Sequence, residues 1–143
     1  MAERDPLALE QQLCFALYTA SRALTARYRP LLDDLGLTYP QYLVMLALFD
    51  RGSLTVKDLG QALQLDSGTL SPLLKRMEAA GLLRRTRSSA DERSVVVELT
   101  DAGEALRPRV REIPRTVFRE LDTPLSDLID LHSRLTTFLG KLD

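Results

Sequence analysis

The spacing of apolar residues along the chain predicts a mainly helical protein that begins and ends with a long amphipathic helix. Over residues 7–35 apolar side chains recur every three or four positions, as on one face of a helix, and we expect Gly36 to end this helix. Over residues 121–142 they follow the alternating four-three spacing of a helix that packs lengthwise against another. We expect this last helix to start after Pro124.

Polar residues that suit helix N-termini predict shorter helices in the middle of the chain. Thr38 and Gln41 fit a capping box, and the helix behind them runs to about Phe49. Thr55 is placed to cap a second helix over residues 56–63.

A third helix is predicted to run to Ala80, with Asp66 or Ser67 as its cap. Pro72 falls inside it, where a proline removes a backbone hydrogen bond and crowds the preceding turn. Either the helix bends at Pro72, or its regular part starts later with Ser71 as cap. The sequence leaves both possibilities open.

After the third helix the pattern changes to that of a β-hairpin. Residues 82–86 and 94–99 are predicted strands, the second rich in valine, and the residues between them are polar and charged. Thr100 is then placed to cap another helix, which we expect to be interrupted near Pro108 and Pro114.

The order of these elements is that of a winged helix-turn-helix, so the expected fold class is mainly α with a small β-hairpin wing. We expect a single domain over residues 1–143, with the winged lobe at 39–103. Residues 1–38 and 104–143 carry more apolar surface than this lobe can cover. They are therefore predicted to be dimerisation helices of an obligate homodimer.

Composition excludes several other classes of protein. The chain has 143 residues, of which 45% are hydrophobic and 27% charged, as in an ordinary soluble domain. Its polar N-terminus is unlike a signal peptide and no apolar run is long enough to span a membrane, so we expect a cytoplasmic protein with no membrane partner. One cysteine and one histidine argue against disulfides, metal sites and most catalytic triads, and no cofactor is expected.

Positive charge is concentrated in the predicted third helix and hairpin. The net charge is −1, yet residues 75–93 hold six basic and three acidic residues. A helix-turn-helix places the start of its second helix in the major groove, and a wing lies along the minor groove or backbone. Asp91 is placed to orient the Arg93 guanidinium. The predicted DNA-binding residues are Ser67, Gly68, Thr69, Ser71, Pro72, Lys75, Arg76, Arg85, Arg87, Asp91 and Arg93.

The hairpin carries a specific motif, Asp-x-Arg-Ser at 91–94, followed by a valine-rich strand and Leu-Thr-x-x-Gly at 99–103. With this motif, residues 54–103 resemble the winged-helix core of MarR-type repressors, and the resemblance extends over nearly the whole chain. Residues 65–76 are similar to the organic-hydroperoxide-resistance (OhrR-like) subgroup of that family. The resemblance implies a homodimer that binds an inverted repeat in double-stranded DNA.

Cys14, beside the apolar stripe of the first predicted helix, is the candidate reactive group. Tyr18 lies one helical turn away, whereas Tyr28 is about 21 Å along the helix. In an antiparallel dimer the Tyr28 of another copy could approach Cys14, and its Tyr39 could do so too. Their hydroxyl groups would then favour the thiolate. The resemblance implies the same redox-sensing set, with Cys14, Tyr28 and Tyr39 at matching positions and Tyr18 as a weaker match. A lone cysteine is otherwise commonly an inert buried residue.

These patterns predict a DNA-binding transcriptional repressor that senses organic hydroperoxides. Oxidation of Cys14 to a sulfenic acid would release the operator DNA. With no second cysteine, the sulfenic acid would be trapped by a small cellular thiol, form a sulfenamide, or oxidise further.

Two other functions remain open at this point. One is a MarR-type repressor that responds to a small aromatic or lipophilic ligand, with Cys14 purely structural. The other is a thiol peroxidase, against which stand the DNA-binding segment and the absence of a Pro-x-x-x-Thr-x-x-Cys run before Cys14. We therefore expect a protein that is not an enzyme.

Overall fold

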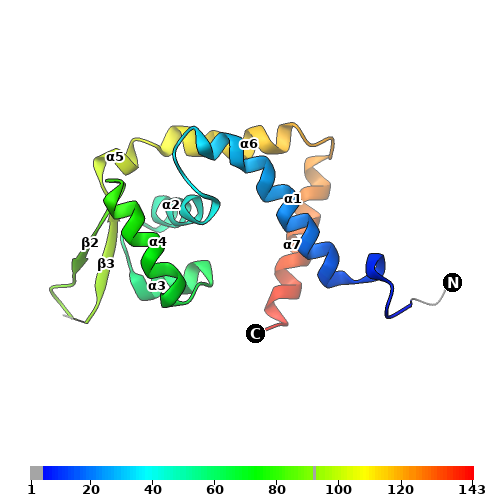
Figure 1. The fold of residues 1–143 in the computed structure, drawn as a ribbon, viewed down its shortest axis with the longest axis horizontal. Helices are drawn as coiled ribbons and strands as arrows, with labels where there is room; N and C mark the ends of the chain where they lie inside the picture. Colours follow the sequence, from blue (N-terminus) through cyan, green and yellow to red (C-terminus); the bar gives the residue numbers. More distant parts are fainter. Residues whose placement is uncertain (1–4, 92) are drawn as a thin grey trace. The chain divides into compact units, whose positions relative to one another are not determined.

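A computed structural model describes residues 5–91 and 93–143 and shows helices with one small sheet, in the predicted order (Figure 1). The chain divides into two units, one ending at Ile113 and the other beginning at Pro114, within α6. The elements are η1 (Leu9–Gln11), α1 (Leu13–Asp33), α2 (Tyr39–Arg51), β1 (Leu54–Thr55), α3 (Val56–Leu63), α4 (Ser67–Ala79), β2 (Leu83–Arg87), β3 (Val95–Leu99), α5 (Asp101–Glu104), α6 (Arg107–Arg119) and α7 (Leu125–Gly140).

The first long helix begins later than the apolar pattern predicts. A single turn of 3₁₀ helix, η1, is followed by Gln12 in an extended conformation, and α1 starts at Leu13. The Gln12 side-chain amide donates hydrogen bonds to the carbonyls of Pro6 (2.7 Å) and Ala8 (3.1 Å). The prediction of a helix from residue 7 is therefore wrong, because this side chain closes a local turn.

The capping residues of the middle helices are confirmed. Thr38 and Gln41 form both hydrogen bonds of a capping box at the start of α2. Thr55 caps α3, and Asp66 caps α4 by accepting a 2.7 Å hydrogen bond from the Thr69 backbone N–H. Local hydrogen bonding therefore sets where these three helices start.

Helix α4 is continuous from Ser67, so the alternative start with Ser71 as cap is wrong. Pro72 lies within the helix and cannot donate to the carbonyl of Gly68. Both residues are exposed, so water can solvate that carbonyl. The interruption expected near Pro108 is present between α5 and α6, whereas Pro114 does not end α6.

Across the described residues, the sheet has three antiparallel strands in the order β1-β3-β2. Strand β3 is central, and its Val97 pairs with Leu54 on one side and Arg85 on the other. The two-residue strand β1 was not predicted, because two residues are too few to show an alternating pattern. Strand β2 is left as an edge strand.

The core of the first unit joins the helix-turn-helix to the sheet and to the helices that flank it. The apolar face predicted for α4 is buried as expected. The buried side chains of this unit are Tyr28, Leu32, Leu37, Tyr42, Val44, Met45, Leu48, Leu59, Leu70, Leu73, Leu74, Met77, Leu83, Val97, Val110 and Ile113.

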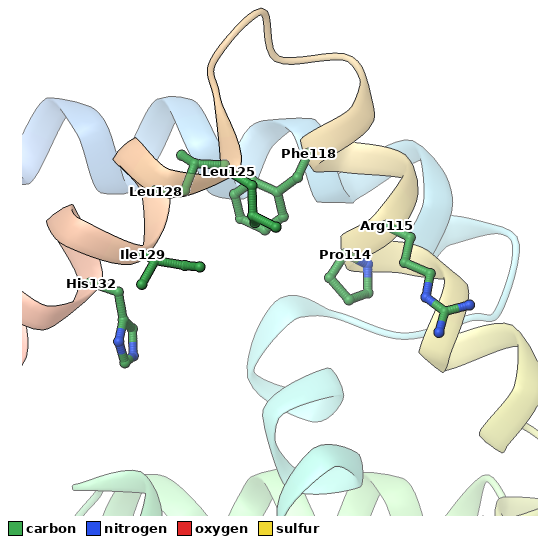
Figure 2. Close-up of a pocket in the computed structure, with 7 residues that line it drawn as sticks. All are labelled: Pro114, Arg115, Phe118, Leu125, Leu128, Ile129 and His132. Carbon is green, nitrogen blue, oxygen red and sulfur yellow. The ribbon is translucent and has the colours of Figure 1, made fainter.

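The second unit exposes much of its apolar surface. Helix α7 has no buried residue, and Leu125 and Ile129 are 71% and 61% exposed. Side chains of α6 and α7 line a largely apolar hollow of about 380 Å³. Figure 2 shows Phe118, Leu128 and His132 among the residues in its wall. None of the described helices is long and apolar enough to cross a membrane.

Candidate DNA-binding and sensing sites

Helix α4 has the two faces that a recognition helix needs. Leu70, Leu74 and Met77 are fully buried and hold the helix against the lobe. The predicted DNA-binding residues of the opposite face are all exposed. They are Ser67, Gly68, Thr69, Ser71, Pro72, Lys75 and Arg76.

The N-terminus of α4 is ordered by its cap. The hydrogen bond from the Thr69 backbone N–H lowers the pKa of the Asp66 carboxyl, so this group is ionised at neutral pH. An ionised N-cap is favourable at the positive end of the helix dipole. Asp66 therefore fixes the end of the helix from which Ser67 and Thr69 project.

The tip of the wing is closed by hydrogen bonds among its own residues. The Ser88 backbone N–H donates to the Ser94 carbonyl at 2.8 Å. The Asp91 carboxylate accepts hydrogen bonds from the Arg93 backbone N–H (3.0 Å) and the Ser94 hydroxyl (3.4 Å). Asp91 therefore orders the backbone of the tip, whereas we expected it to orient the Arg93 guanidinium. Arg87 and Arg93 are exposed.

Arg85 differs from the other predicted DNA-binding residues because its side chain is engaged within the lobe. It is only 29% exposed and forms an ion pair with Glu78 of α4, with Nη2 3.1 Å from Oε1. Arg85 is thus directed toward α4, while Arg87 and Arg93 remain open to solvent.

Replacing Arg87 or Arg93 by alanine is expected to weaken DNA binding about tenfold and to reduce the salt slope of the binding constant by about one. The reason is the loss of one phosphate contact and its released counterion.

Binding would be measured at salt concentrations from roughly 50 to 200 mM, a range over which such slopes can be resolved. The probe is a duplex that the reduced protein selects from a random-sequence pool, called here the selected duplex. Arg109→Ala, an exposed arginine of α6, is the matched control and should keep the slope. An unchanged slope in both wing variants would exclude phosphate contacts at the tip.

Three tyrosines form a cluster where α1 meets α2. The ring centroids of Tyr28 and Tyr39 are 5.3 Å apart in an edge-to-face arrangement. The ring of Tyr42 lies 5.6 Å from Tyr28 and 5.7 Å from Tyr39. Two predicted sensing residues are therefore neighbours within one chain. Sequence reasoning missed Tyr42, although its spacing of three from Tyr39 places both on one face of α2.

The environment of the cluster keeps its phenols protonated. Burial raises the pKa of Tyr28, Tyr39 and Tyr42. The proximity of Tyr39 raises that of Tyr28 further. Within residues 5–91 and 93–143, none of the three hydroxyl groups forms a hydrogen bond. The cluster therefore offers phenolic O–H donors at neutral pH to a group from outside this chain.

Cys14 is exposed near the start of α1 and is not brought close to Tyr28 within the chain. Along the helix axis the two residues are about 21 Å apart. The neighbours of Cys14, namely Leu13, Phe15 and Tyr18, are also exposed. Among the described residues no cluster of His, Cys, Asp and Glu could hold a metal ion.

Comparison with known proteins identifies the family. The chain is 50% identical to the organic hydroperoxide resistance transcriptional regulator of Bacillus subtilis, over 96% of this chain and 94% of the relative. The chain belongs to the organic-hydroperoxide-resistance regulators of the MarR family. The related family described as transcriptional regulator SarA/Rot matches residues 26–108.

Solved structures of MarR-family regulators have the same fold. Reduced AbfR bound to DNA is 34% identical, with a TM-score of 0.79 over 94% of each chain. Another structure of the same regulator, from Staphylococcus epidermidis, gives the same TM-score at 36% identity, over 94% of this chain and 92% of that one. A MarR variant of E. coli complexed with operator DNA has a TM-score of 0.84 at 22% identity, over 95% of this chain and 99% of that one, and supports the fold alone.

These comparisons confirm the predicted winged helix-turn-helix and its function in transcription. This MarR-family chain is a DNA-binding transcriptional regulator and not an enzyme. Among the functions left open by the sequence, the hydroperoxide-responsive one is favoured over the ligand-responsive one.

Proposed function

We propose that the protein is a homodimeric repressor that binds an inverted repeat and releases it when an organic hydroperoxide oxidises Cys14. This proposal rests mainly on the position of Cys14, the one cysteine in the sequence. Cys14 is exposed in the single chain, on a helix whose neighbouring apolar side chains are exposed with it. A thiol that is accessible and flanked by an uncovered apolar surface suits a sensor at a subunit interface.

A second copy is the natural cover for this surface. Among the described residues, large exposed apolar side chains lie on the segment from Leu7 to Tyr18 and on the segment from Leu125 to Leu142, with Leu46 as the exception. Side chains of α6 and α7 also line an apolar hollow within the second unit (Figure 2). Surfaces of this kind usually mark protein interfaces. The predicted dimerisation segments, residues 1–38 and 104–143, contain both of them.

In the dimer, the tyrosine cluster of one subunit would act on the cysteine of the other. Tyr28 and Tyr39 have hydroxyl groups without partners within the described chain, and both stay protonated at neutral pH. Two phenolic donors at the Cys14 sulfur would stabilise its thiolate, which is the nucleophilic form. Tyr18, 59% exposed and one turn from Cys14, would border the same site.

The sensing reaction is a two-electron oxidation of sulfur. The Cys14 thiolate attacks the distal oxygen of the hydroperoxide, an S–O bond forms and the O–O bond breaks. Sulfur becomes a sulfenic acid, and the remaining alkoxide takes up a proton and leaves as an alcohol. A small cellular thiol can then attack the sulfenic sulfur, giving a mixed disulfide and water.

We infer that the mixed disulfide is the form that releases DNA. The relative AbfR has been solved bound to DNA in both the reduced and the overoxidised state. An overoxidised form is thus compatible with DNA binding in that protein, which favours a bulkier adduct as the releasing species here. An adduct inside the interface would change the spacing of the two winged lobes, so that they no longer fit two half-sites.

Replacing both Tyr28 and Tyr39 by phenylalanine is expected to slow oxidation of Cys14 by an organic hydroperoxide at least tenfold, since about tenfold is a typical effect of one lost hydrogen bond to a charged group. The rings and their packing remain, so the reduced variant should bind DNA as tightly as the reduced wild type does. Oxidation of the pure protein by cumene hydroperoxide would be followed by intact mass. Tyr42→Phe is the matched control, because it removes a hydroxyl from the same cluster without touching the proposed donors. Equal rates in the double variant and the wild type would exclude the tyrosines from sensing.

A further inference from the structure

The outer edge of the wing is tied to the recognition helix by one residue. In the part of the chain that the structure describes, strand β2 pairs with β3 on one side only, so every second backbone N–H of β2 points away from the sheet. Glu78, in the last turn of α4, accepts a hydrogen bond from the Arg85 backbone N–H at 2.9 Å. Its second carboxylate oxygen accepts one from Arg85 Nη2 at 3.1 Å. A single carboxylate therefore joins the helix to both the backbone and the side chain of the strand.

These contacts hold Arg85 in place. Its Nε is buried and has no hydrogen-bond partner among residues 5–91 and 93–143. The guanidinium is thus kept in this position although one of its donors has lost contact with water. The hydrogen bond from the Arg85 backbone holds the pKa of Glu78 below its usual range. Glu78 is thus ionised at neutral pH and forms charge-assisted bonds, which are the stronger kind.

We propose that Glu78 is a positioning residue for DNA binding, which locks the wing to the recognition helix through Arg85. The start of α4 and the wing tip must reach the same duplex at once. In addition to the turn at Gly81, the Glu78–Arg85 contacts set the angle between helix α4 and the wing. This inference rests on the proposed contact of Arg87 and Arg93 with DNA, and it assigns Arg85 a role through Glu78 in place of direct DNA contact.

The sign of the effect separates this role from simple electrostatics. Removing a carboxylate beside a DNA-binding surface should by itself strengthen binding, because phosphate repulsion is reduced. If Glu78 positions the wing, Glu78→Gln should instead weaken binding about tenfold, comparable with loss of a wing contact. Glu98→Gln is the matched control. Glu98 is a carboxylate of similar exposure in the same wing, and its 2.7 Å ion pair is with Arg84 of β2, whereas that of Glu78 joins β2 to α4.

A double-mutant cycle then shows whether Glu78 acts through the wing. Arg87→Ala should cost less affinity in the Glu78→Gln background than in the wild type, because a misplaced wing has already lost that contact. Thr69→Ala, at the other end of α4, should cost the same in both backgrounds. Affinity would be measured with the reduced full-length protein and the selected duplex. A melting temperature for each variant would show that it folds. Should Glu78→Gln fail to fold, Arg85→Lys keeps the backbone bond and is expected to show the same coupling to Arg87.

The outcomes distinguish this inference from the proposal on which it rests. If Arg87→Ala leaves wild-type binding and its salt slope unchanged, the wing contact itself is wrong. If Arg87→Ala weakens binding but Glu78→Gln binds as tightly as Glu98→Gln, with an additive cycle, the positioning role of Glu78 is overturned.

Discussion

Replacement of Cys14 by serine is expected to leave DNA binding intact and to abolish its response to organic hydroperoxide. Serine has nearly the size of cysteine, and Cys14 lies on α1, outside the helix-turn-helix and the wing. The reduced variant should therefore bind the selected duplex as the wild type does. A hydroxyl cannot be oxidised to a sulfenic acid, so no adduct can form.

In the wild type, hydroperoxide together with cysteine should lower DNA affinity by a factor within about 5–150, the usual range of coupling between two sites. The serine variant should stay within roughly twofold of its untreated affinity under the same treatment. Binding would be measured by fluorescence anisotropy before and after treatment, with intact mass to follow the modification. Release of DNA by the serine variant would show that Cys14 is not the sensor.

Gly103→Ala is expected to be the most destabilising small substitution in the lobe. A Cβ at this position would overlap the backbone carbonyl of Leu82 and would lie 3.1 Å from Leu99 Cδ2. The carbonyl cannot move away freely, because it accepts a 3.1 Å hydrogen bond from the Thr100 backbone at the base of the wing. We expect the free energy of unfolding to fall by about 3 kcal/mol, the upper end for overpacking a core.

Thermal unfolding followed by circular dichroism checks this effect. A loss of that size corresponds to a melting temperature roughly 6–12 °C lower for a domain of this length. Gly140→Ala is the matched control, since a Cβ at residue 140 of α7 meets nothing within 4 Å. If the Gly103→Ala protein had the same melting temperature as the wild type, the close approach of α5 to the wing would not be rigid.

This contact also gives a physical reason for the sequence motif at residues 99–103. Thr100 caps α5 through the Gly103 backbone N–H, and its hydroxyl donates to the Gly81 carbonyl at 2.6 Å. Gly103 lets α5 approach the Leu82 carbonyl closely. The motif thus joins the wing to the following helix, and it was recognisable before its contacts were known.

The features that could be predicted from sequence are those set by neighbours in the chain. The capping residues Thr38 and Thr55 act within three positions, so their helices were placed nearly to the residue. The apolar face of α4 follows from helical periodicity, and burial confirms it. The redox residues were singled out by their types and by the family resemblance, and the structure brings Tyr28 and Tyr39 together.

The features that could not be predicted depend on side chains that are distant in the chain or locally ambiguous. Arg85 has the sequence signature of a DNA-binding arginine, and only the folded hairpin shows that it contacts Glu78, seven residues earlier. The start of α1 was misplaced because the Gln12 side chain replaces helical hydrogen bonds. A continuous α4 tolerates Pro72 because the Gly68 carbonyl is exposed to water, and a sequence pattern does not reveal this exposure.

A single titration shows whether modification of Cys14 releases DNA. The reduced protein, bound to the selected duplex, would be treated with increasing cumene hydroperoxide in the presence of cysteine. DNA release and the mass of the protein would be measured in the same samples. We expect the fraction of DNA released to follow the fraction of protein that carries a cysteine adduct on Cys14, and we expect hydroperoxide alone to release less. Full adduct formation with DNA still bound would contradict this expectation.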